Sequence, residues 1–207
     1  MKPVIETHAL CKSYHGRLVV DHLDLCVPEG CVYGFLGPNG AGKSTLLNLI
    51  AGEIPPDEGT VTVGDTVVLG YFSQHAKELD PNQTALDYVK ERGDRIETPE
   101  GTLTASRLMD KFLFSGPMQH RLIGKLSGGE RRRLFLLGIL ASAPNVLLLD
   151  EPTNDLDIET LNVLEDYLDS FQGAVIAVSH DRYFLDRVTR KLFALEDGEL
   201  IPYIGGY

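Results

Sequence analysis

The octapeptide GPNGAGKS at residues 37–44 fits the pattern G-x-x-x-x-G-K-[ST] and decides the predicted fold. It follows an apolar run at residues 31–36 that predicts a buried strand, and it leads into residues 44–51, which predict a helix. Glycines let the backbone N–H groups point at an anion, and the helix behind them adds the positive end of its dipole. The octapeptide therefore predicts a phosphate-binding loop, with Lys43 near the β- and γ-phosphates of a nucleotide and the Ser44 hydroxyl offered to Mg²⁺.

Two carboxylates follow another apolar run later in the chain. Residues 146–149 predict a buried strand, and Asp150 and Glu151 come directly after it. Sheets of α/β proteins bind ligands at the carboxyl ends of their strands. Asp150 is therefore predicted in the Mg²⁺ shell, and Glu151 as the general base that polarises an attacking water. On its own, the pair is also compatible with two solvated acids at a strand end, but the phosphate loop upstream favours the catalytic interpretation.

Strands alternate with helices in the second half of the chain. Residues 174–178 predict a strand, and residues 158 to about 170 predict a helix whose Leu161, Leu164 and Leu168 line one face. This alternation predicts an α/β fold with a mainly parallel sheet covered on both faces. A β-rich opening and a polar, helical middle from about Pro81 to Lys125 are predicted as additions to that core. A hairpin turn is expected at residues 196–199.

Composition sets the broad class of the protein. Of the 207 residues, 43% are hydrophobic, which is typical of a folded domain. The net charge of −11 argues against a broad nucleic-acid-binding face. No apolar run approaches the ~18 residues of a membrane span, and the N-terminus does not resemble a signal peptide. We therefore expect a soluble protein located in the cytoplasm. The three cysteines, at positions 11, 26 and 31, fit no zinc spacing and are expected to be small apolar or half-buried residues.

The pentapeptide LSGGE at residues 126–130 makes the prediction specific. Ser127 and Glu130 form an S-x-x-E capping box at a helix start, and the glycines leave backbone amides open to an anion. Alone, the pentapeptide predicts only a capped helix. Together with the phosphate loop and the acid pair, it resembles the signature sequence of ATP-binding cassette (ABC) domains. The resemblance covers nearly the whole chain and implies a P-loop NTPase core, an N-terminal antiparallel β-subdomain, and a helical subdomain that carries LSGGE.

The resemblance also implies roles for residues that are ambiguous by themselves. Tyr14 matches the aromatic residue that stacks on adenine, Gln74 matches the glutamine that contacts Mg²⁺ and water, and His180 matches the switch histidine near the γ-phosphate. The predicted catalytic residues are Glu151, His180, Lys43 and Gln74. The predicted ligands of Mg²⁺ are Ser44, Gln74 and Asp150. The predicted ATP-binding residues are Tyr14, Gly37, Pro38, Asn39, Gly40, Ala41, Gly42, Lys43, Ser44 and Thr45.

The resemblance further implies that the chain works with a partner. ABC domains sandwich two ATP molecules between two domains, and each site takes the phosphate loop of one and the signature of the other. Ser127, Gly128 and Gly129 are therefore expected to act in trans. Residues 1–207 are predicted to be a single ABC domain, with a helical subdomain at about 80–143. It is expected to need a second copy of itself or a fused second cassette.

Four stretches are most similar to the ABC-F class of this family: GYFSQ at 70–74, EPTNDLD at 151–157, SHDRYFLD at 179–186 and the tail at 203–207. ABC-F proteins carry tandem cassettes, bind the ribosome and its rRNA, and act in translation or in antibiotic resistance by ribosome protection. The chain departs from that pattern because it has one cassette and no long linker, and its compact middle fits a second cassette. The run Arg131 to Arg133 is expected to be a solvated helix face, in preference to an RNA contact.

Two other functions remain open at the level of sequence. The chain could be the ATPase motor subunit of a membrane transporter, because most ABC domains drive transport. It could also be a nucleotide-dependent assembly module with little turnover, although the presence of both Glu151 and His180 disfavours this. The motifs thus predict an ATPase, and they favour the ABC-F class over a transporter motor or an assembly module.

Overall fold

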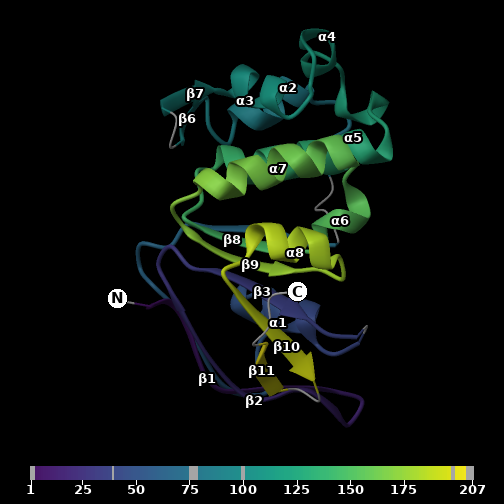
Figure 1. Ribbon diagram of the computed structural model, residues 1–207. Coiled ribbons are helices and arrows are strands. Elements are labelled where there is room, and N and C mark those ends of the chain that lie inside the picture. Colours follow the sequence, from purple (N-terminus) through teal and green to yellow (C-terminus); the bar gives the residue numbers. More distant parts are fainter. Residues whose placement is uncertain (1–2, 39, 75–78, 99–100, 197–198, 204–207) are drawn as a thin grey trace.

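The computed structural model describes residues 3–38, 40–74, 79–98, 101–196 and 199–203 (Figure 1). Its centre is a six-stranded sheet in the order β11-β10-β3-β9-β8-β5. All neighbouring strands from β10 to β5 run parallel, and only β11 is antiparallel to its neighbour. The bounds are β3 (Val32–Leu36), β5 (Leu69–Phe72), β8 (Val146–Asp150), β9 (Ala174–Val178), β10 (Lys191–Glu196) and β11 (Glu199–Tyr203).

Helices cover both faces of this sheet, as predicted. Helix α1 (Lys43–Ile50) lies on one side, and α7 (Ile158–Ser170) and α8 (Arg182–Val188) lie on the other (Figure 1). Successive residues of β8 contribute to different apolar clusters: Val146 and Leu148 pack with α1, whereas Leu147 and Leu149 pack with α7 and α8. A strand buried on both faces is continuously apolar, which is why its sequence reads as an unbroken hydrophobic run.

A second, antiparallel sheet forms the N-terminal part of the fold. Its strand order is β2 (Arg17–Pro28), β1 (Pro3–Tyr14) and β4 (Glu58–Val63). The apolar residues of its inner face, among them Ile5 and Leu25, join the cluster around α1. Repeated register shifts between the long strands β1 and β2 interrupt the period-two alternation of their side chains.

A third part packs beyond α7, at the top of Figure 1. It contains α2 (Ala85–Lys90), α3 (Ala105–Lys111), α4 (Gly116–Gln119), the 3₁₀ turn η1 (Ile123–Lys125) and α5 (Gly128–Ala141). This part is helical, as the sequence predicts, and it also contains an antiparallel hairpin that the sequence did not indicate, formed by β6 (Arg95–Thr98) and β7 (Gly101–Thr104). The predicted turn at 196–199 falls partly outside the described residues, and its first and last residues, Glu196 and Glu199, form the terminal pair of the β10–β11 hairpin.

The start of α5 is built as the sequence predicts. The Ser127 side chain accepts a hydrogen bond from the Glu130 N–H at 3.2 Å, and the Ser127 N–H donates to Glu130 Oε2 at 2.6 Å. These bonds satisfy orphan donors at the helix start. The expectation of a solvated arginine face is wrong, because the side chains of Arg132 and Arg133 are only 9% and 13% exposed. In the part of the chain that the structure describes, no helix combines the length and apolar character needed to cross a membrane.

Candidate active site

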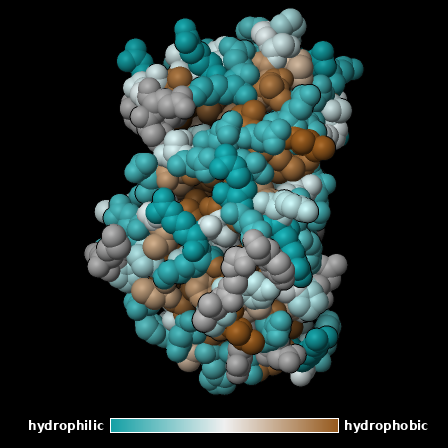
Figure 2. All heavy atoms as spheres, in the orientation of Figure 1, coloured by the Kyte–Doolittle hydropathy of each residue, from teal (hydrophilic) through white to brown (hydrophobic). Residues whose placement is uncertain are grey.

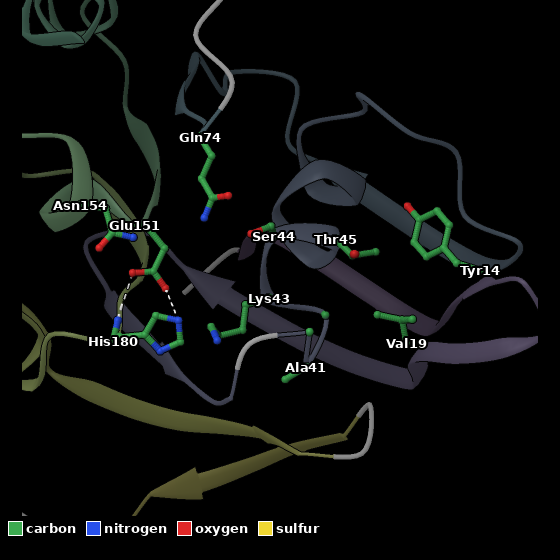
Figure 3. A pocket seen from close by; sticks show the side chains of 12 residues that line it. Tyr14, Val19, Ala41, Lys43, Ser44, Thr45, Gln74, Glu151, Asn154 and His180 are labelled. Atoms are coloured by element: carbon green, nitrogen blue, oxygen red, sulfur yellow. Dashed lines mark hydrogen bonds and ion pairs between the residues drawn. The ribbon is translucent and has the colours of Figure 1, made fainter. Parts of the chain in front are cut away.

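The phosphate loop borders a cavity of roughly 730 Å³ at the amino end of α1 (Figure 3). Gly42, which caps α1, has a φ of 94°, and a Cβ there would lie 2.5 Å from the Val19 carbonyl oxygen. Only glycine fits this left-handed position at such close approach. The cavity is lined by Tyr14, Val19, Gly40, Ala41, Gly42, Lys43, Ser44, Thr45, Gln74, Glu151, Asn154 and His180. Most of the residues predicted to contact the nucleotide therefore meet in one space. Asp150 is buried and is not among the described residues that line it.

Lys43 is held inside this loop. Its Nζ donates to the carbonyl oxygens of Gly37 and Pro38, at 2.6 and 3.0 Å, and the residue is buried. Burial lowers the pKa of the Lys43 ammonium, while Glu151 and Asp150 act in the opposite direction. The loop thus keeps a partly desolvated ammonium group beside the predicted phosphate position. A charged phosphate oxygen would bind this group more strongly than the two neutral carbonyl oxygens do.

Ser44 and Asp150 meet at the junction of α1 and β8. The Ser44 Oγ donates to Asp150 Oδ1 at 2.9 Å, and Asp150 is buried. Burial raises the pKa of the Asp150 carboxyl, whereas the Ser44 hydrogen bond lowers it. In Figure 3 the Gln74 side chain points toward Ser44. A hydroxyl, a carboxylate and an amide oxygen form the hard-oxygen donor set that Mg²⁺ prefers, so the residues present fit this ion.

Glu151 and His180 face each other across the carboxyl ends of β8 and β9. The His180 N–H donates to Glu151 Oε2 at 3.1 Å, and His180 Nε2 lies 3.0 Å from Glu151 Oε1 (Figure 3). The second contact lacks hydrogen-bond alignment, and Oε1 is buried without a hydrogen-bond partner among the residues that the structure describes. Glu151 itself has a left-handed backbone with a φ of 50°. This turn directs a carboxylate with an available acceptor oxygen into the cavity, as a general base requires.

Tyr14 forms the far end of the cavity. It ends β1, the residue is 44% exposed, and its ring stands apart from the Glu151–His180 pair (Figure 3). Asp57 anchors the last residues of β1 before Tyr14, because its carboxylate accepts from the Ser13 N–H at 2.7 Å and from Lys12 Nζ at 2.7 Å. An exposed aromatic ring on an anchored strand end is suited to stack on a planar base.

A buried arginine that the sequence did not single out joins three segments around the site. Arg132, on α5, donates through Nη2 to the Ser73 carbonyl at 2.5 Å and to Asp155 Oδ2 at 2.8 Å. Its guanidinium also lies 4.0 Å from the centre of the Phe72 ring. Ser73 precedes Gln74, and Asp155 follows Asn154, so Arg132 links α5 to two segments that line the cavity. Within the run of three arginines, no local signal distinguishes this residue from its neighbours.

Some predicted residues lie elsewhere. Gly37 and Pro38 take part through their carbonyl bonds to Lys43, and Asn39 lies outside the described residues. Ser127, Gly128 and Gly129 are not among the described residues that line the cavity, because they stand at the start of α5. Apart from the adjoining backbone of α5, a Cβ added at Gly128 or Gly129 would meet no atom of the described residues within 4 Å. The signature is therefore an open surface within this chain, separate from the phosphate loop.

Comparison with known proteins identifies the family. Residues 20–154 match the profile of the family described as ABC transporter. The chain belongs to the ABC transporter family. It is an ABC ATPase cassette, with the α/β core and antiparallel β-subdomain of that fold. A solved structure described as the ATP-binding subunit of an ABC transporter superposes with a TM-score of 0.80 at 18% identity, covering 95% of this chain and 88% of that one.

Curated relatives cover this cassette almost completely. An uncharacterized ABC transporter ATP-binding protein of Bacillus subtilis, YfmR, is 50% identical over 208 residues, covering 100% of this chain and 33% of the relative. The energy-dependent translational throttle protein EttA of Escherichia coli K12 is 42% identical over 203 residues, covering 98% of this chain and 37% of the relative. The cassette thus spans about a third of the length of these relatives. A dimeric, post-hydrolysis structure of the ATP-binding cassette MJ0796 with ADP and Pi has a TM-score of 0.77 at 21% identity, covering 98% of this chain and 100% of that one.

Proposed function

We propose that this cassette binds ATP with Mg²⁺ in the cavity behind the phosphate loop. The triphosphate lies along the backbone of residues 37–45, Lys43 contacts its terminal phosphates, and Tyr14 stacks on the adenine. Ser44, Asp150 and Gln74 hold Mg²⁺, which supplies charge neutralisation for the phosphate oxygens. The buried pair of Ser44 and Asp150, joined at 2.9 Å, supports this assignment because it unites the loop with the acidic strand end.

Glu151 and His180 carry the hydrolytic step in this proposal. Glu151 accepts the proton of an attacking water through a carboxylate oxygen, and His180, held to Glu151 by its backbone N–H at 3.1 Å, faces the γ-phosphate. Gln74 helps to orient the water. Positioning and charge supply most of the catalysis, as is usual in phosphoryl transfer. The finding that supports the assignment is that Glu151, His180 and Gln74 line the same cavity as the phosphate loop.

The functional unit of this proposal contains two cassettes. Residues 1–207 form one ABC domain, and the part at about 80–143 presents Ser127, Gly128 and Gly129 to the nucleotide of a second cassette. That partner is a second copy of this chain or a cassette fused to it. The proposal is supported by the open surface at Gly128 and Gly129, and by a structural neighbour that is described as dimeric.

We further propose that the intact protein is of the ABC-F class and uses the ATP cycle to act on the ribosome and its rRNA in the cytoplasm. The observation that carries this assignment is the 42% identity, over 98% of the chain, to a protein named for translational throttling. A transporter motor is the second candidate. It is favoured by the 50% identical B. subtilis relative, which is named an ABC transporter ATP-binding protein.

Co-sedimentation with ribosomes distinguishes these candidates. The Glu151→Gln variant, which is expected to retain ATP, is centrifuged with purified ribosomes in the presence and absence of ATP and Mg²⁺. ATP-dependent pelleting is the expected result, and a Glu151→Gln/Lys43→Ala double variant should not pellet because it does not hold the nucleotide. If the single variant binds ATP and yet stays in the supernatant, the ribosomal proposal fails for this chain and the transporter role is favoured.

A further inference from the structure

The antiparallel sheet brings three possible metal ligands together away from the nucleotide cavity. Cys11 on β1, His22 on β2 and Glu58 on β4 each offer one ligand atom, and these three atoms lie within 4.8 Å of one another. Cys11 is buried, whereas His22 and Glu58 are exposed. A thiol therefore forms the inner side of this cluster, and two solvent-facing side chains form its outer side. None of the three lines the nucleotide cavity.

Irregular strand pairing creates this cluster. Toward β2, Cys11 stands alone opposite two residues, Asp21 and His22, which is a β-bulge, and His22 has a left-handed backbone with a φ of 42°. Toward β4, Cys11 pairs directly with Glu58 next to a second register shift. Bulges change the direction in which side chains point and are over-represented beside functional sites. A left-handed backbone is uncommon for residues other than glycine, so His22 adopts an unusual backbone conformation in placing its ring here.

The surroundings of the cluster prepare two of its members for a metal ion. Asp21 Oδ1 lies 2.5 Å from Nδ1 of His22. A proton shared there leaves Nε2 with its lone pair, and metal-binding histidines commonly donate their other N–H to a carboxylate in this way. The Cys11 sulfur accepts the His22 backbone N–H at 3.2 Å. This bond holds the sulfur beside the residue that carries the imidazole.

We propose that Cys11, His22 and Glu58 form a zinc site, with water as the fourth ligand. Thiolate, imidazole and carboxylate together are ligands that Zn²⁺ accepts, whereas Mg²⁺ and Ca²⁺ are bound through oxygen. On binding, the Sγ–Zn bond forms and the thiol proton, now directed at the Ala9 carbonyl at 3.5 Å, passes to solvent. The exposed His22 and Glu58 side chains close on the buried sulfur to reach bond lengths of about 2.0–2.3 Å. The ion then joins all three strands of the sheet that carries Tyr14.

Cobalt is the probe for this site, because Co²⁺ substitutes for Zn²⁺ and a sulfur ligand gives it a charge-transfer band in the near ultraviolet. The chain is stripped with a chelator and titrated with Co²⁺ and then with Zn²⁺. We expect the band to appear with one Co²⁺ per chain and to disappear as Zn²⁺ displaces it. Cys11→Ser should abolish the band, and Cys26→Ser, at an exposed thiol on the same sheet, should leave it unchanged. Asp21→Asn should weaken affinity by about tenfold or more.

The charge-transfer band of the wild-type chain is itself evidence of a sulfur ligand. The test therefore does not depend on how well a variant folds. Absence of the band in the wild-type chain, or a band that survives Cys11→Ser, would overturn the proposal. Thermal unfolding gives a second measurement. Zn²⁺ should raise the unfolding midpoint of the wild type and of Asp150→Asn, which lacks the Mg²⁺ ligand, but not that of Cys11→Ser. Equal shifts in the wild type and in Cys11→Ser would also contradict the site.

Discussion

Ser44 and Asp150 are 106 positions apart in the sequence, and the Ser44 hydroxyl donates a hydrogen bond of 2.9 Å to the Asp150 carboxylate. The contact joins the first turn of α1 to the end of β8, on the face where the phosphate loop opens. It holds a buried carboxylate at a place where burial alone disfavours its charge. A buried carboxylate of this kind lowers the stability of the free chain and raises its affinity for a cation.

The effect of the buried Asp150 charge on the free energy of unfolding can be measured as a function of pH. The pKa of Asp150 is raised in the folded chain, so its contribution to stability is present below its unfolded pKa and is lost as pH rises through the folded pKa. Asp150→Asn should therefore increase the free energy of unfolding at neutral pH, measured in urea without nucleotide, and the gain should vanish in acid. Asp166→Asn, whose side chain is 81% exposed, serves as the control. A destabilised Asp150→Asn chain at neutral pH would contradict this account.

Lys43 should determine nucleotide affinity with little effect on folding. Its Nζ now binds two loop carbonyls, and phosphate oxygens are stronger, charged acceptors. Lys43→Ala is expected to weaken ATP binding by about tenfold or more, since charge-assisted hydrogen bonds contribute roughly 1.5–3 kcal/mol each. Calorimetric titration with ATP and Mg²⁺ gives the measurement, and Lys90→Ala, on α2 away from the cavity, should bind as the wild type does. Unchanged affinity in Lys43→Ala would remove Lys43 from the site.

Much of the core and the candidate site follows from sequence because the signals are local. The helix α7 matches its predicted bounds, and β8 and β9 are apolar runs of strand length. The β6–β7 hairpin was missed because it is a short, polar pair of strands whose packing on the helices around it decides its structure. The role of Arg132 was missed for a similar reason. A charged residue on a helix is normally solvated, and only the fold brings Phe72, Ser73 and Asp155 around it.

Arg132 should act as a positioning residue. Arg132→Met keeps an apolar stem beside Phe72 but releases the Ser73 carbonyl and Asp155, which frees the segments that carry Gln74 and Asn154. We expect ATP turnover to fall by several-fold to about 100-fold, because small displacements of catalytic groups are costly. Nucleotide affinity should change little. Arg131→Met is the matched control, because Arg131 is exposed and its side chain donates to the Leu126 carbonyl at 2.9 Å, away from Ser73 and Asp155. A variant with wild-type turnover would contradict the role.

Mixing two inactive variants tests whether the signature acts across two cassettes. Gly129→Asp puts a negative charge at the signature, where the structure has open space and the fold should tolerate it. Lys43→Ala disables the phosphate loop. In a mixed dimer, the intact loop of one chain meets the intact signature of the other, so the mixture should hydrolyse ATP although neither variant does so alone. Addition of the Gly129→Asp/Lys43→Ala double variant to either single variant is the negative control. A mixture that stays inactive, while each variant still dimerises, would argue against action in trans.

The central claim is that Glu151 is the general base of an ATPase cassette, and steady-state turnover at saturating ATP and Mg²⁺ tests it most directly. Glu151→Gln preserves the side-chain shape but removes the proton acceptor, so turnover should fall by about 10²–10⁴-fold while ATP affinity is retained. Glu159→Gln, an exposed change on α7, should hydrolyse ATP at the wild-type rate. Near wild-type turnover in Glu151→Gln would contradict the account, because the carboxylate that faces His180 would then not be the group that activates water.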